Sequence, residues 1–151
     1  AASDVYKRQP VEDGVDGYIT FSYPSIINGH EFEEVRLTVE KGRIVEAVCK
    51  DAEKNANLLS YIDTDEGSRY FGEVAIGTNY GIQKHTKNIL FDEKIGGSMH
   101  MAIGEGFQEA GGKNTSAIHW DMINDMTKEG KIYADGELFY ENGHFLPEVL
   151  K

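Results

Sequence analysis

The chain of 151 residues contains little cysteine, little proline and few positive charges. Cys49 is the only cysteine, so no internal disulfide can form and a reducing compartment such as the cytoplasm is expected. No apolar run approaches the length of a membrane-spanning helix, and Ala1–Gln9 lacks the hydrophobic region of a signal peptide. The net charge of −11 argues against nucleic acid and anionic membranes as partners.

What the chain does contain predicts one globular domain of the α+β class, or a piece of a larger one. The apolar fraction of 40%, with eight tyrosines and seven phenylalanines, is enough for a sizeable core. Alternation and turn signals predict a mixed, mainly antiparallel sheet. The expected strands are Tyr18–Tyr23, Val35–Val39, Arg43–Cys49, Gly72–Gly77, Ser116–Ile123, and a hairpin of Ile132–Ala134 with Glu137–Tyr140.

Two helices are expected, each beginning after an aspartate that can cap it. The first follows Asp51 and runs to about Ile62, with Ala52, Ala56, Leu59 and Ile62 on its inner side. The second follows Asp92 and covers Glu93 to about Gly104. Between the sheet segments, Thr78–Asn88 is polar and is predicted to be a loop.

Three short stretches of the chain gather the residue types that hydrolytic metal sites use. The candidates are three carboxylates and two imidazoles, namely Glu73, Glu93, His100, His119 and Asp121. Carboxylate and imidazole are ligands for Zn²⁺ and similar ions. No cysteine lies nearby, and thiol-free sets suit hydrolytic sites better than structural zinc sites.

The spacing of these residues allows them to meet. Glu93 and His100 are seven residues apart, which places both side chains on one face of the expected helix. His119 and Asp121 are two apart, which places them on one side of a strand, with Trp120 on the other side. Glu73 lies in an otherwise apolar strand, where a carboxylate needs a partner. That partner can be a metal ion or an arginine or lysine.

Each of these residues also has an ordinary structural interpretation. Glu73 alone is more typical of a salt bridge, His100 alone of an ordinary core or surface histidine, and a His-x-Asp pair occurs often by chance. The remaining histidines, His30, His85 and His144, are expected on the surface without ligand partners. Cys49 and Trp120 are expected to pack in the core.

At these residues the chain resembles the aminopeptidase T/aminopeptidase S family of two-metal peptidases, which includes the PepS-like enzymes. The matching stretches are DTDEGSRY (63–70), GEVAIGTNYG (72–81), TKNILFDEKIGGSMH (86–100), GGKNTSAIHWDM (111–122) and YADGELF (133–139). The resemblance implies that Glu73, Glu93, His100, His119 and Asp121 form the metal centre. It also implies two divalent ions (Zn, Co or Mg), a peptide substrate, a cytoplasmic location and a homodimer.

Two departures from the family pattern concern activity. The family carries an amino-terminal domain and a further metal-binding glutamate just upstream of the stretch near Pro10–Asp13, and this chain has no counterpart to that glutamate. Ala1–Gln9 does not continue the pattern and is expected to be a non-native leader, which leaves 10–151 as the carboxy-terminal metal-binding region. Phe107 stands where the family has a tyrosine thought to assist catalysis, and phenylalanine has no hydroxyl.

The sequence therefore predicts the carboxy-terminal part of a metal-dependent aminopeptidase, in a truncated form. Glu93 is the candidate catalytic residue, and the sequence leaves open whether it binds metal or moves a proton. The alternative is a folded, inactive fragment that acts at most in self-association or binding. A third interpretation is a metal-free module whose acidic groups form salt bridges.

Overall fold

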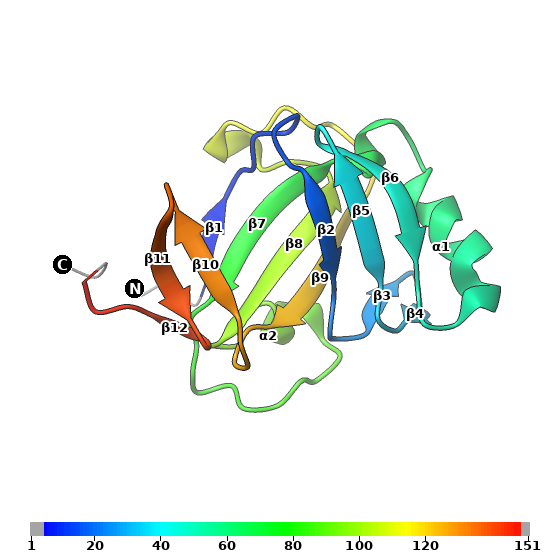
Figure 1. Cartoon of the computed structure of the whole chain (residues 1–151). Helices are drawn as coiled ribbons and strands as arrows, with labels where there is room; N and C mark the ends of the chain where they lie inside the picture. The colour runs from blue at the N-terminus through cyan, green and yellow to red at the C-terminus, as the bar shows by residue number, and fades with distance from the viewer. Residues whose placement is uncertain (1–4, 149–151) are drawn as a thin grey trace.

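The computed structural model describes residues 5–148, which form two main antiparallel sheets (Figure 1). The central sheet has the strand order β1-β7-β8-β9, with bounds Val5–Arg8, Phe71–Gly77, Ser98–Gly104 and His119–Asp125. The second sheet has the order β2-β5-β6, with bounds Gly17–Thr20, Arg36–Glu40 and Arg43–Val48. Two smaller sheets consist of β3 (Ser25–Ile27) with β4 (His30–Phe32), and of β10 (Lys131–Ala134), β11 (Glu137–Glu141) and β12 (His144–Phe145).

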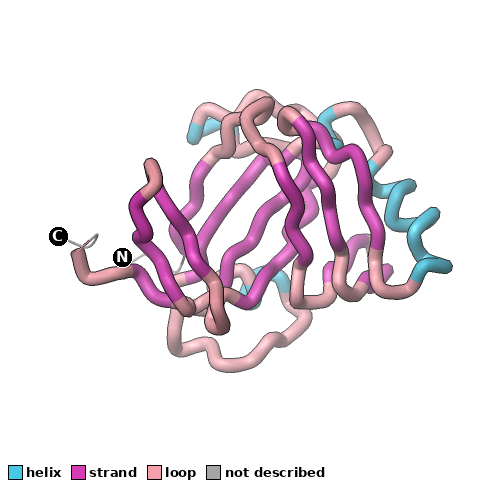
Figure 2. The backbone as a smooth tube through the Cα atoms, viewed as in Figure 1, coloured by secondary structure: helices cyan, strands magenta, loops and turns pink. Residues whose placement is uncertain are grey.

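Strands dominate the described residues, and helices are few and short (Figure 2). The α-helices are α1 (Asn55–Ile62) and α2 (Ile89–Asp92), and the 3-10 helices are η1 (Ala52–Lys54), η2 (Gly67–Arg69) and η3 (Gln108–Ala110). Within residues 5–148, no helix has the length and apolar character needed to cross a membrane. The predicted α+β fold with a mainly antiparallel sheet is confirmed.

The main core lies where one face of the central sheet packs against the β2-β5-β6 sheet and α1. The central sheet contributes Phe71, Ile103, Trp120 and Met122, and the other elements contribute mainly aliphatic residues such as Leu37. Trp120 is 2% exposed and contacts the rings of Phe32 and Tyr61. The expectation that Trp120 and Cys49 pack in the core is confirmed, because both belong to this cluster.

The register of the central sheet decides which side chains share its other face. Ala102 of β8 is paired with Glu73 of β7 and with Asp121 of β9. Side chains of directly paired residues point to the same side of a sheet, and so do residues two apart on one strand. His100 therefore lies on the face that carries Glu73, and His119 lies on the face that carries Asp121. All four point away from the core.

The helix predicted after Asp51 is present, but it begins as a 3-10 turn. The Asp51 carboxylate accepts a hydrogen bond from the backbone N–H of Glu53 at 3.1 Å, and η1 then continues into α1. Leu58 and Ile62 are fully buried, whereas Ala52 and Ala56 are exposed. The predicted inner face is therefore wrong for both alanines, because only a narrow stripe of the helix contacts the core.

The helix predicted over Glu93–Gly104 is wrong. The helix in this region is α2, which ends at Asp92, and residues 98–104 form β8. Gly97 has a φ of +85°, in the left-handed region, so no right-handed helix passes through this position. From residue 98 onward, the backbone N–H and C=O groups form hydrogen bonds with both β7 and β9. This strand pairing outweighs any helical tendency of the segment.

Several strand predictions are confirmed with shifted ends. Gly72–Gly77 lies in β7, and the strand predicted over Ser116–Ile123 is β9, which begins at His119. The hairpin of β10 and β11 turns at Asp135 and Gly136, which both have positive φ. Residues 5–8, within the expected leader, form the edge strand β1 paired with β7. Residues 1–4 lie outside the described residues, and the leader assignment stays a prediction.

Candidate metal centre

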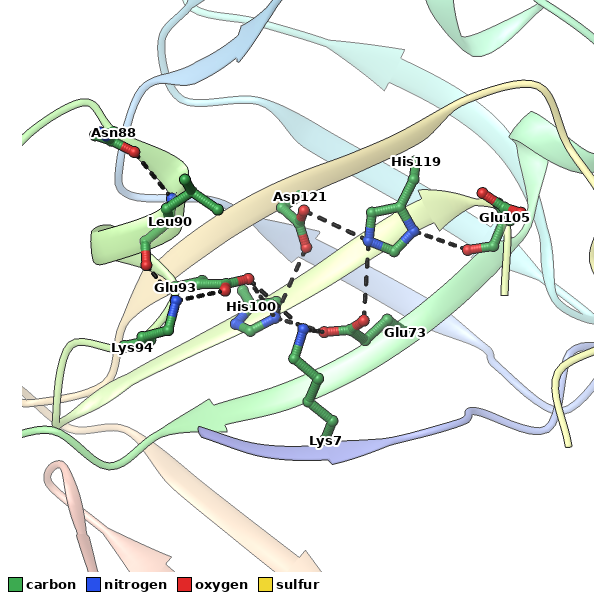
Figure 3. A network of polar contacts seen from close by, with 10 residues as sticks. All are labelled: Lys7, Glu73, Asn88, Leu90, Glu93, Lys94, His100, Glu105, His119 and Asp121. Atoms are coloured by element: carbon green, nitrogen blue, oxygen red, sulfur yellow. Dashed lines mark hydrogen bonds and ion pairs between the residues drawn. The ribbon is translucent and has the colours of Figure 1, made fainter. Parts of the chain in front are cut away.

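His100 lies at the centre of a polar cluster on the outer face of the central sheet (Figure 3). Its Nε2 atom is 2.8 Å from Glu73 Oε1, 3.7 Å from Asp121 Oδ1 and 4.0 Å from Glu93 Oε2. The His100 side chain is fully buried, and Glu73 is 4% exposed. Ligand atoms of Glu73, His100 and Asp121 all lie within 4.8 Å of one another, which is close enough for one ion to contact all three.

His119 joins the cluster from the first position of β9. Its Nε2 atom is 3.5 Å from Asp121 Oδ2 and 3.8 Å from Glu73 Oε2. Its Nδ1 atom is 2.8 Å from the backbone carbonyl oxygen of Glu105. A carbonyl can only accept, so Nδ1 carries the hydrogen and Nε2 faces the carboxylates. Metal-binding histidines are commonly oriented in this way.

Glu93 reaches the cluster from a different element than expected. It is the residue after α2, not a helical neighbour of His100, so the predicted shared helix face is wrong. Its Oε1 atom accepts a hydrogen bond from Lys94 Nζ at 2.9 Å, and Lys94 Nζ also contacts the Leu90 carbonyl. The Glu93 side chain is 14% exposed, so it lies at the margin of the cluster.

Lys7 also points into the cluster from β1, and no pattern in the sequence predicts this contact. Its Nζ atom is 3.0 Å from Glu73 Oε1 and 3.7 Å from Glu93 Oε2. β1 is antiparallel to β7, and Lys7 is paired with Ala75, two residues from Glu73 on the same face. One ammonium group therefore neutralises part of the charge that three carboxylates bring together.

The cluster perturbs the acid–base behaviour of its members. Burial would raise the pKa of Glu73, but hydrogen bonds from His100 and Lys7 outweigh it and lower the pKa to about 2. The hydrogen bond and charge of Asp121, with the Glu105 carbonyl, raise the pKa of His119 to about 9 against the opposing effect of burial. Burial lowers the pKa of Lys7, yet the hydrogen bond to Glu73 and the surrounding carboxylates raise it overall.

A divalent ion fits this set of groups. Asp121 Oδ1 is buried and has no hydrogen-bond donor, although it faces His100. A buried ionised oxygen without a donor is costly, and a bound cation would relieve that cost. Three carboxylates with two imidazoles are hard and borderline donors of the kind that Zn²⁺, Co²⁺ or Mg²⁺ accept. The donor chemistry, not the size of a cavity, makes this cluster a candidate metal centre.

A cavity lies elsewhere in the molecule, away from this cluster. A cavity of about 930 Å³ is lined by segments 9–13, 65–70 and 110–116 and contains none of the five candidate residues. Glu12 lies at this cavity, where its carboxylate accepts hydrogen bonds from the backbone N–H groups of Lys113 and Asn114. Phe107 is 52% exposed at the start of η3.

The remaining histidines differ from one another. His30 and His144 are exposed, as predicted. His85 is not a surface residue without a partner: its Nε2 atom is 3.1 Å from Asp92 Oδ2, and its side chain is 18% exposed. Asp92 itself is 1% exposed, whereas the sequence predicts for it only the capping of a helix. The sequence shows only that Asp92 precedes Glu93 in the motif FDEK. It does not predict the contact between Asp92 and His85, because that contact depends on the path of the intervening loop.

Comparison with known proteins gives one family for most of the chain. Residues 3–145 match the model of the thermophilic metalloprotease (M29) family. Aminopeptidase AmpS of Bacillus subtilis (strain 168) is 36% identical over 159 residues, which cover 90% of this chain and 38% of the relative. Aminopeptidase T of Thermus thermophilus is 28% identical over 144 residues, which cover 84% of this chain and 35% of the relative.

Two solved structures share the fold. Wild-type AmpT from Thermus thermophilus superposes with a TM-score of 0.78 at 25% identity, over 95% of this chain and 40% of that protein. The 2,5-dihydroxypyridine dioxygenase of Pseudomonas putida KT2440 superposes with a TM-score of 0.69 at 21% identity, over 92% of this chain and 42% of that protein. The second likeness concerns the fold alone, since one fold can host unrelated chemistry. The chain thus spans about two fifths of the length of the proteins it resembles.

Proposed function

The chain belongs to the thermophilic metalloprotease (M29) family, and from this premise we propose that its polar cluster is the metal centre of an aminopeptidase. The observation that carries the proposal is the convergence of three carboxylates and two imidazoles on one sheet face. The relatives named aminopeptidases support peptides as the substrate class. The chain spans 38% of the length of AmpS, so the activity of a whole enzyme is part of the proposal.

Glu73, His100, His119 and Asp121 would hold the ions, and Glu93 would contribute from the margin. Bound divalent ions supply a water molecule of lowered pKa and polarise the scissile carbonyl. The strands hold the first four residues in place, so little reorganisation accompanies binding. The hydrogen bond from His119 Nδ1 to the Glu105 carbonyl keeps Nε2 directed at the cluster.

Glu93 is suited to accept and return a proton. Its carboxylate is partly exposed and lies beside the ammonium groups of Lys94 and Lys7. An ionised carboxylate within reach of water can take a proton from a nucleophilic water and deliver it to the leaving amine. The negative charge of the cluster would also attract the ammonium group at the amino terminus of a peptide.

A second candidate function is that of a folded, inactive fragment with a role in self-association or binding. Lys7 favours it, because its ammonium lies where a cation would contact Glu73 and Glu93. The absent hydroxyl at Phe107 favours it as well.

We further propose two ions of the Zn, Co or Mg group, a cytoplasmic location and a homodimer. The division into a leader, 1–9, and a metal-binding region, 10–151, belongs to the same proposal.

The test combines metal titration of the purified chain with hydrolysis of amino-acid anilides. We expect binding of Zn²⁺ or Co²⁺ and weak, chelator-sensitive release of anilide. Metal binding without hydrolysis would favour the inactive fragment. No saturable binding would overturn the metal centre and leave the salt-bridge interpretation of the acidic residues.

A further inference from the structure

Next to the partly exposed Glu93 lies a buried carboxylate that the proposed chemistry does not use. Asp92, the last residue of α2, is 1% exposed. Its Oδ1 atom accepts hydrogen bonds from the backbone N–H of Thr86 at 2.7 Å and from Thr86 Oγ1 at 2.8 Å. Its Oδ2 atom is 3.1 Å from His85 Nε2. Both oxygens are thus bound, and the buried group holds one defined arrangement.

His85 links this carboxylate to the central sheet. Its ring stacks on Tyr23, with ring centroids 4.5 Å apart and an interplanar angle of 12°. The backbone N–H of Tyr23 donates to the Ile123 carbonyl of β9 at 3.2 Å. A continuous series of contacts therefore joins β9, Tyr23, His85 and Asp92. Through it, a loop and a short helix are fastened to the strand that carries His119 and Asp121.

Glu93 depends on this attachment more than the other cluster residues do. α2 has four residues, and a helix of one turn has no stability of its own. The position of the Glu93 carboxylate, 4.0 Å from His100 Nε2, is therefore set by whatever holds α2 in place. A cavity of about 40 Å³ is lined by His85, Asp92 and Asp121 together, which places the pair beside the cluster.

We propose that His85 and Asp92 are positioning residues, which hold the Glu93 carboxylate at the metal centre through α2. This inference rests on the proposed function, because Glu93 must act on a bound ion for its position to affect binding. A purely structural role of the pair would alter stability without any specific link to Glu93. The two roles therefore differ in their coupling to Glu93.

The test is a double-mutant cycle on metal affinity, measured by calorimetric titration with Co²⁺ at fixed pH. We expect His85→Ala to weaken binding about tenfold, the lower end of the range for residues that orient metal ligands. In a Glu93→Gln background the same change should alter affinity less than about twofold, since the group it positions has been removed. In a His119→Ala background, His85→Ala should keep its full effect on the Co²⁺ affinity. His85→Gln, whose side-chain amide can still donate to Asp92, should restore most of the affinity.

His144→Ala is the matched control. The His144 ring also stacks on a tyrosine, Tyr80, with centroids 4.9 Å apart, but it is exposed and lies outside the cluster. Its removal should leave the Co²⁺ affinity unchanged. An equal loss from His85→Ala with and without Glu93, or no loss at all, would overturn the positioning role.

A measurement without metal separates this inference from the proposed function. Hydrogen exchange of the backbone amides of residues 91–95 should be at least about tenfold faster in His85→Ala than in His85→Gln, because α2 loses its attachment. Amides of β8 should exchange alike in both variants. If the unaltered chain binds no Co²⁺, the proposed function fails, and the exchange result decides whether His85 holds α2. Equal exchange in the two variants would overturn the inference by itself.

Discussion

The two faces of the central sheet carry opposite chemistry on alternate residues of the same strands. On β9, Trp120 is 2% exposed in the core, and its neighbour Asp121 faces the polar cluster with an unpaired oxygen. On β8, Ile103 is fully buried against the second sheet, whereas His100 is fully buried among carboxylates. Burial alone therefore does not distinguish the two faces. On the apolar face, the buried side chains are held by packing against other apolar groups. On the polar face, they are held by interactions between charged groups.

This difference assigns separate tasks to the two faces. The apolar face stabilises the fold by removing large side chains from water. The polar face gathers like charges, which costs free energy unless cations are near. A rigid packed face allows the strands to hold these charges in place before any ion binds. We therefore expect changes on one face to affect stability and changes on the other to affect metal binding.

The largest expected effect comes from the apolar face. Trp120→Ala should lower the free energy of unfolding by about 3–5 kcal/mol, as for other buried aromatic truncations, because it leaves a large cavity. Trp120→Phe should cost less, since Nε1 of Trp120 has no hydrogen-bond partner to lose. Denaturant titration without added metal measures both. Near-normal stability of Trp120→Ala would break the assignment of tasks to the two faces.

The adjacent residue should show the reverse pattern. Asp121→Asn should weaken Zn²⁺ affinity roughly a hundredfold, the share of one ligand in the binding free energy of a four-ligand zinc site. Its stability without metal should change much less than that of Trp120→Ala, because the neutral amide also removes the cost of burying the Asp121 Oδ1 charge without a donor. Asp125→Asn at the far end of β9 is the control. Equal losses of affinity from both variants would indicate non-specific attraction of ions to an acidic surface.

Lys7 offers a smaller effect in the opposite direction. Lys7→Met should strengthen Zn²⁺ affinity about tenfold, because it removes a cation that competes for Glu73 and Glu93. Lys7→Glu should strengthen it further by adding a carboxylate. Arg8→Met removes a positive charge from the neighbouring position of β1, which points to the opposite face. If Arg8→Met has the same effect as Lys7→Met, the gain reflects net charge and not the site.

The smallest expected effect is a pH dependence of stability in the absence of metal. The pKa of His119 is raised from 6.5 to about 9, so its charged form stabilises the fold fully below pH 6.5. That contribution should be lost as the pH rises from 6.5 through 9. Denaturant titrations across this range should show a steeper decline for the unaltered chain than for His119→Asn. Parallel declines would mean that His119 does not hold its proton through Asp121.

The part of the site that lies on β7 and β9 could be predicted from the sequence, because it follows from local alternation. His119 and Asp121 lie two apart on β9, and Glu73 lies in an apolar strand, as predicted. The roles of all five residues as ligands stay a proposal. The family resemblance placed the chain correctly, as the match over residues 3–145 confirms.

The rest of the site, on β1, on β8 and in the loops, could not be predicted in the same way. The seven-residue spacing of Glu93 and His100 predicted a helix, yet the two meet across the turn at Gly97. Lys7 and His85 reach their partners through contacts between segments far apart in the sequence, and no local pattern encodes such contacts. Sequence periodicity describes which face a strand residue occupies. It does not describe what a loop or an edge strand brings to that face.

The most direct test of the central claim is a crystal structure of the chain with Zn²⁺, using anomalous scattering to locate the ion. We predict a peak bounded by Glu73, His100 and Asp121, with ligand distances of about 2.0–2.2 Å, the usual range for nitrogen and carboxylate oxygen. Lys7 should move away from Glu73 in that structure. An ion bound only elsewhere on the surface, with the Lys7–Glu73 pair intact, would contradict the assignment of this sheet face as a metal centre.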